Sequence, residues 1–199
     1  MNKKTNTAYL SQFSPDMKIF ELVEISPSLL SIFSRLNIRL PFGDISVAEM
    51  CEREGHSVEL FLMLASMHTD TSFRPQKEHL RAEMLTEVIE YLRASHRYYA
   101  EHMLPHTSAH LEKILQHCAN LFKSALRRFY DEYTDYIISH FEEEERNIFS
   151  IIDNCTTENY SEQVCTLFDM PHADIDDRSN DIASLIFKNL PEEAPTTLR

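Results

Sequence analysis

Histidine and glutamate side chains recur on the apolar faces of the long helices predicted in the second half of this chain. In the predicted helix 121–152, apolar residues recur every three or four positions, and His140 and Glu144 fall on this stripe, one turn apart. A carboxylate buried without a partner costs free energy or changes its protonation, so Glu144 needs a partner. A His and a Glu four residues apart inside a bundle can both ligate a metal-ion pair, and we predict this chemistry here. The alternative is a solvated acidic face, which we prefer for the neighbours Glu142 and Glu143.

Two further histidines stand at similar positions on other predicted helices. His96 lies among apolar residues of a helix that begins near residue 79, and His172 opens a third long helix with Asp176 one turn later. The alternatives are a hydrogen-bonded core histidine for His96 and, for Asp176, an acidic residue that suits the helix dipole. Because three helices each place one His on the inner stripe, we predict that His96, His140, Glu144 and His172 bind one metal centre. Asp176 is the weaker candidate, as a bridging carboxylate or one that orients a ligand.

Three other histidines are spaced by four residues: His102, His106 and His110. Pro105 interrupts that stretch of helix, so the spacing need not give one face. His110 also lies about 21 Å beyond His96 along a straight helix. We therefore predict that these three face solvent and take no part in the metal centre; the alternative is a weak adventitious affinity for metal ions.

The composition excludes several other classes of protein. The chain of 199 residues has only two glycines and a net charge of −13, which favours helices and argues against non-specific binding to nucleic acid or to an anionic membrane surface. No apolar run approaches the 18 residues that suggest a membrane-spanning helix, and the polar start lacks the apolar core of a signal peptide. We expect a soluble, cytoplasmic, all-α protein. Its four cysteines form no CxxC pair, so we expect free thiols rather than a zinc finger.

The pattern of helices changes along the chain. Residues 12–70 predict a small domain of short helices, with a capping box at Ser46 and Glu49, a helix end at Gly55 and a cap at Ser57. Its expected core residues are Phe20, Leu30, Phe33, Phe61 and Leu64. Residues 69–76 predict a linker.

Long helices follow the linker. They are expected at about 79–117 with a kink at Pro105, at 121–152 and at 172–190, with a short piece near 161–168. Long helices joined by short loops predict an antiparallel bundle over residues 78–190, followed by a tail at 191–199.

The motifs resemble those of hemerythrin-like domains in the iron–sulfur cluster repair proteins (the ScdA/YtfE-like group). The resemblance covers residues 80–190 and extends to a similar small N-terminal domain. It is carried by His96 with Tyr98-Tyr99 and Leu104-Pro105, by His140-Phe141-Glu142-Glu143-Glu144 with Ile148-Phe149, by His172-Ala173-Asp174-Ile175-Asp176, and in the front domain by residues 32–38 and 47–51.

The resemblance implies a non-haem di-iron centre bridged by carboxylates. Two departures accompany it. A Cys-Cys pair usual in the small domain is replaced by Leu40-Pro41-Phe42-Gly43, and no fourth-helix H-x-x-x-E motif follows His172 before Arg199. A continuation of the chain or another subunit, as in a homodimer, would supply the missing ligands; otherwise the centre is incomplete.

Three functions follow as expectations. The first is a stress-response iron protein that helps to repair damaged iron–sulfur proteins or handles nitric oxide and oxygen species. Manganese or zinc would suit the same donors almost as well as iron. The second is the sensory region of a transcriptional regulator whose output domain lies beyond residue 199, and the third is a metal-free helical interaction protein. No catalytic residue is assigned, and whether the protein is an enzyme stays open.

Overall fold

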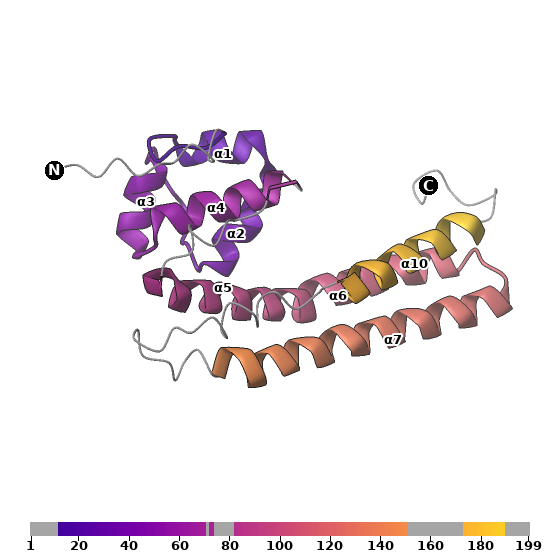
Figure 1. Cartoon of the computed structure of the whole chain (residues 1–199). Helices are drawn as coiled ribbons and strands as arrows, with labels where there is room; N and C mark the ends of the chain where they lie inside the picture. Colours follow the sequence, from indigo (N-terminus) through magenta and orange to yellow (C-terminus); the bar gives the residue numbers. More distant parts are fainter. Residues whose placement is uncertain (1–11, 71, 74–81, 151–172, 190–199) are drawn as a thin grey trace. The chain divides into compact units, whose positions relative to one another are not determined.

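The computed structural model describes residues 12–70, 72–73, 82–150 and 173–189, and the described part is all-α, as predicted (Figure 1). The only β feature in these ranges is an isolated antiparallel bridge between Lys18 and Ser46. Helices account for more than half of the chain, which confirms the prediction from the 3.6-residue periodicity. The helices, with 3-10 turns and π-helices marked η, are α1 (Ile19–Ile25), η1 (Pro27–Leu29), α2 (Leu30–Arg35), α3 (Val47–Glu54), α4 (Val58–Thr69), η3 (Ala82–Met84), α5 (Leu85–Tyr98), η4 (Tyr99–Met103), α6 (Leu104–Leu115), α7 (Asn120–Glu144), η5 (Glu145–Phe149) and α10 (Ala173–Asn189).

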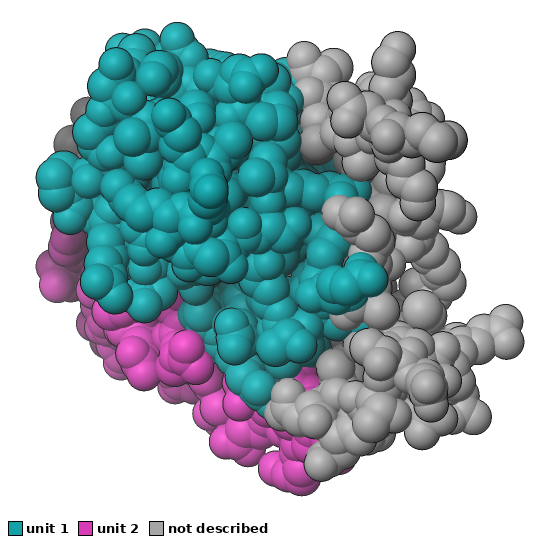
Figure 2. Space-filling view, turned by 90° about the vertical axis from the view of Figure 1, so that its left-hand side faces the viewer, with its two compact units in different colours: residues 1–95 teal, residues 96–199 magenta. Residues whose placement is uncertain are grey.

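The chain divides into two compact units, residues 1–95 and residues 96–199, coloured separately in Figure 2. The division falls inside α5, between Ser95 and His96. Met84 of η3 and Tyr91 of α5 are buried in the core of the first unit. The predicted domain limits themselves stay predictions.

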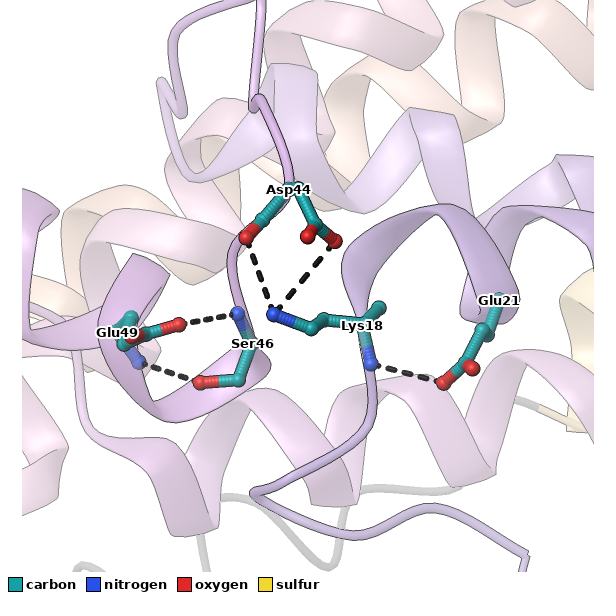
Figure 3. Close-up of polar contacts among 5 residues, drawn as sticks. All are labelled: Lys18, Glu21, Asp44, Ser46 and Glu49. Atoms are coloured by element: carbon teal, nitrogen blue, oxygen red, sulfur yellow. Dashed lines mark hydrogen bonds and ion pairs between the residues drawn. The ribbon is translucent and has the colours of Figure 1, made fainter.

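Two helix starts are joined side by side in the first unit (Figure 3). The backbone N–H of Lys18, just before α1, donates to the carboxylate of Glu21 at 2.9 Å, and the Lys18 ammonium donates to the carbonyl of Asp44 at 3.0 Å. Ser46 and Glu49 form the predicted capping box at the start of α3: the Ser46 N–H donates to Glu49 Oε2 at 2.7 Å and the Glu49 N–H to Ser46 Oγ at 3.2 Å. These contacts satisfy backbone N–H groups that the first turn of a helix leaves without partners.

The other predicted helix boundaries of the first unit are also confirmed. Gly55 ends α3 with φ at +79°, a left-handed conformation that a residue without Cβ adopts readily. Ser57 caps α4 by accepting from the Leu60 N–H at 3.3 Å. The carboxylate of Glu87, on α5, accepts from the Ser57 N–H at 3.1 Å and lies 2.8 Å from His56 Nδ1, so it fixes the start of α4 to α5.

The core of the first unit is formed by all four of its short helices and the first part of α5. Phe33, Phe61 and Leu64 are buried as predicted, with the rings of Phe33 and Phe61 stacked 5.7 Å apart. The prediction was wrong for Phe20 and Leu30, which are 51% and 45% exposed. Their neighbours Ile19 and Leu22 on α1, and Leu29, Ile32 and Phe33 around α2, are buried instead. Adjacent helical residues point about 100° apart, so the face that packs excludes the residue next to it.

The second unit contains long helices. Figure 1 shows α6 and α7 side by side and antiparallel, joined by a short turn at residues 116–119, with α10 along α7. Leu111, Leu115 and Leu126 are buried between these helices, and Ile182 and Leu185 of α10 pack against them. The observed bounds agree with the predicted helices 79–117, 121–152 and 172–190 within the described residues, while the short piece near 161–168 lies outside them. No helix in the described part of the chain is both long and apolar enough to cross a membrane.

Candidate metal centre

His96 is surrounded by four side chains from the end of α7 and from η5. It lies in the last turn of α5, and its residue is only 8% exposed. Its Nε2 atom lies 3.1 Å from Oε2 of Glu144, and its Nδ1 atom lies 3.0 Å from Oε1 of Glu145. The Phe141 ring stacks on the imidazole with centroids 4.1 Å apart, and the Phe149 ring lies 5.4 Å away, also stacked. Both ring nitrogens therefore face carboxylates, while the aromatic rings exclude water from the ring itself.

Glu144 connects His96 to the second histidine. Its other oxygen, Oε1, lies 3.3 Å from Nε2 of His140, one turn earlier on α7. The side chains of Glu144 and His140 are 15% and 14% exposed. One largely buried carboxylate thus lies between two imidazoles that come from two different helices.

A π-helix follows each half of this cluster. After α5 the chain forms η4, Tyr99–Met103, in which the Leu104 N–H donates to the carbonyl of Tyr99, five residues earlier. After Glu144 it forms η5, Glu145–Phe149. Such single-turn segments insert one residue into an α-helix and are frequent at functional sites. Glu144 and Glu145 follow Phe141 by three and four residues, so all three share one face of the helix, and Phe149 follows Glu145 by four residues within η5.

Two hollows lie beside the cluster on the surface of the second unit. The smaller has a volume of about 190 Å³ and is lined by His96, Arg97, Ala100, Glu101, Ile138, Phe141, Glu142 and Glu145. The larger, of about 440 Å³, shares Ala100 and Ile138 with it and continues along α6 and α7 past Leu104, Tyr130 and Thr134. The shared residues make the two hollows neighbours, and of the two it is the smaller that His96 lines.

Three of the five residues predicted as ligands are brought together: His96, His140 and Glu144. His172 lies outside the described residues. Asp176 lies in α10, but the structure does not describe its side chain. The role of all five as metal ligands stays a prediction.

The sequence reasoning missed Glu145. It belongs to the acidic run that begins at Glu142, and we assigned most of that run to a solvated face. Glu142 and Glu143 are indeed exposed, and so is Glu145 in part, at 44% of its side chain. The α-helical repeat does hold a signal for Glu145, because it follows Phe141 by four residues and its N–H donates to the Phe141 carbonyl, so the two share a face.

The remaining histidines of this region agree with the prediction in their exposure. His102, His106 and His110 all face solvent. They are separate from the cluster around Glu144.

The donors around Glu144 meet in pairs. His96 Nε2 with Glu144 Oε2 is one pair, and His140 Nε2 with Glu144 Oε1 is the other. Within the described ranges, no three His, Cys, Asp or Glu side chains are placed to hold a single metal ion as they stand. The donor types, two imidazoles and carboxylates, are nevertheless those that non-haem iron, manganese and zinc accept.

No family model, no curated protein and no solved structure matches this chain.

Proposed function

We propose that this chain is a non-haem iron protein with a hemerythrin-like helical bundle, and that it works in the repair of iron–sulfur clusters or the response to oxidative or nitrosative stress. The observation that carries the proposal is the position of Glu144 between His96 and His140. The stress-response role rests on the resemblance of the motifs around these residues to the iron–sulfur cluster repair proteins.

The pair distances support a carboxylate that bridges two ions. Two donors that bind one ion at about 2.1 Å lie roughly 3.0 Å apart at a right angle and about 3.4 Å apart at a tetrahedral angle. The distances of 3.1 Å and 3.3 Å on the two sides of Glu144 fall in this range, which overlaps that of a hydrogen bond or ion pair formed without a metal. In this proposal each oxygen of Glu144 serves one ion, with His96 on one side and His140 on the other.

The charge of the cluster also favours a cation. Glu144 and Glu145 bring two carboxylates to the largely buried ring of His96, and like charges close together repel one another. A divalent ion would compensate them. Glu145 would then hold the Nδ1 proton of His96 and leave Nε2 free to bind the metal, as carboxylates beside metal-bound histidines commonly do.

Bound iron would supply an open coordination position for nitric oxide or an oxygen species. The chain's own residues do the rest. Phe141 and Phe149 exclude water from His96, the carboxylates fix its orientation, and the hollows beside Ala100 and Ile138 admit a small ligand. His172 and Asp176 stay in the proposal as further ligands from α10 and the residue before it.

The test is iron loading of the full chain under anaerobic conditions. We expect wild-type protein to bind iron(II), and nitric oxide to produce the electron paramagnetic resonance signal of an iron–nitrosyl. The variant His140→Gln should lose most of the bound iron. The control His117→Gln, an exposed histidine in the turn after α6, should keep it. Circular dichroism would establish that both variants are folded.

Two results would refute the proposal. Equal iron loading of the His140→Gln and His117→Gln variants would place the metal elsewhere. Failure of the folded wild-type chain to bind iron, manganese or zinc at all would favour the metal-free interaction protein.

A further inference from the structure

A second pair of imidazoles lies on α6, apart from the cluster around Glu144. His106 and His110 are one turn apart on the exposed face of the helix, and their Nε2 atoms approach to 3.3 Å. The ring centroids are 4.5 Å apart and the rings are inclined by 61°. The contact is a hydrogen bond in which one Nε2–H donates to the other Nε2, so the outer nitrogens of the two rings face each other.

The distance between these nitrogens matches the separation of two ligand atoms on a tetrahedral metal ion. Zinc binds histidine nitrogen at about 2.0–2.1 Å, so two nitrogens at the tetrahedral angle lie roughly 3.3–3.4 Å apart. A square-planar or octahedral ion would need them at about 2.8–3.0 Å from each other. The observed 3.3 Å agrees with the tetrahedral value. Because both side chains are exposed, small rotations of the rings are enough to direct both lone pairs at one point.

The helix holds the pair in place. Residues four apart on an α-helix lie on the same face, one above the other. Pro105 is at the start of α6, so both histidines follow it and lie in regular α-helix. His102 precedes it, inside the π-helix η4, and has its ring 5.7 Å from that of Tyr98 instead. Of the three histidines spaced by four residues, only His106 and His110 therefore lie together in regular α-helix, after Pro105, whereas His102 lies before it.

We propose that His106 and His110 form a surface site for a tetrahedral divalent ion, zinc in particular. Their two Nε2 atoms are the protein ligands, and water fills the remaining positions. The site is independent of the proposed iron centre and uses none of its residues.

The test is a titration of the full chain, without a polyhistidine tag, with zinc, in which isothermal titration calorimetry measures the binding. It is done in the His140→Gln background, so that the donors around Glu144 compete less for the ion. Replacement of both histidines, His106→Gln with His110→Gln, should weaken the zinc affinity at least about tenfold, because both zinc–nitrogen bonds of the site are lost. The matched control His102→Gln should change it less than about twofold, because that ring faces Tyr98.

Nuclear magnetic resonance gives a residue-specific readout in the wild-type chain. On addition of zinc, the imidazole nitrogen signals of His106 and His110 should shift together, and those of His102 should stay in place. The proposal is overturned if the double variant binds zinc as tightly as its parent, or if His102 and the pair respond alike. The second result would mean only general attraction of cations to an acidic protein.

Discussion

Replacement of Glu145 tests the contact that the sequence did not foresee. Glu145 Oε1 lies 3.0 Å from Nδ1 of His96, on the opposite side of the ring from Glu144. In Glu145→Gln the amide oxygen can still accept the Nδ1 proton, but the negative charge is lost. In Glu145→Ala both the charge and the acceptor are lost.

The expected size of the effect follows from the exposure of the side chain. Loss of a group that orients a metal-bound histidine typically costs about 10- to 100-fold in metal affinity. The side chain of Glu145 is 44% exposed, so water replaces part of what it supplies. We expect iron(II) affinity to fall about tenfold in Glu145→Gln, which corresponds to roughly 1.4 kcal/mol, and further in Glu145→Ala.

The assay is competition for iron(II) with a coloured chelator in the absence of oxygen. Glu143→Gln is the matched control, since it removes the same charge two residues before Glu145, at an exposed position. Equal losses in Glu145→Gln and Glu143→Gln would mean that only the overall charge matters. Unchanged affinity in Glu145→Ala would refute the orienting role of Glu145, even if His140→Gln still abolished iron binding.

Three further predictions concern the first unit. Ser46→Ala removes the oxygen that caps the Glu49 N–H and should lower the free energy of unfolding by about 1 kcal/mol in urea titrations; no change would mean that water replaces the cap. Phe61→Ala removes a ring that is 1% exposed and should cost about 3–5 kcal/mol, whereas the exposed Phe20→Ala should cost far less; similar costs would contradict the core described above. Burial, and secondarily the charge of Arg35, lowers the pKa of His68 below its usual value near 6.5, so the neutral form is favoured in the folded state. The stability that neutral, buried His68 contributes is therefore complete above about pH 6.5 and is lost as the pH falls toward the pKa of the folded state. The difference in unfolding midpoint between wild type and His68→Gln should shrink or reverse from pH 7.5 to 5.5. A difference independent of pH would refute this.

The sequence by itself determined where most helices begin and end. The capping box of Ser46 and Glu49 and the left-handed Gly55 are local devices, because their partners are at most a few residues away. The stripe that contains His140 and Glu144 was also readable, since the α-helical repeat fixes which residues share a face. These features could be predicted without knowing what the helices pack against.

Tertiary packing decided which residues of each helix are buried and which carboxylates meet His96. Phe20 and Leu30 are as apolar as their buried neighbours, so only the position of the adjacent helices could show that they are exposed. The approach of Glu144 and Glu145 to His96 joins residues that are far apart in the sequence, so it depends on how the end of α5 packs against the end of α7. The π-helix η5 adds a second effect, because an inserted residue changes the direction of the side chains that follow it, and no repeat in the sequence records such an insertion.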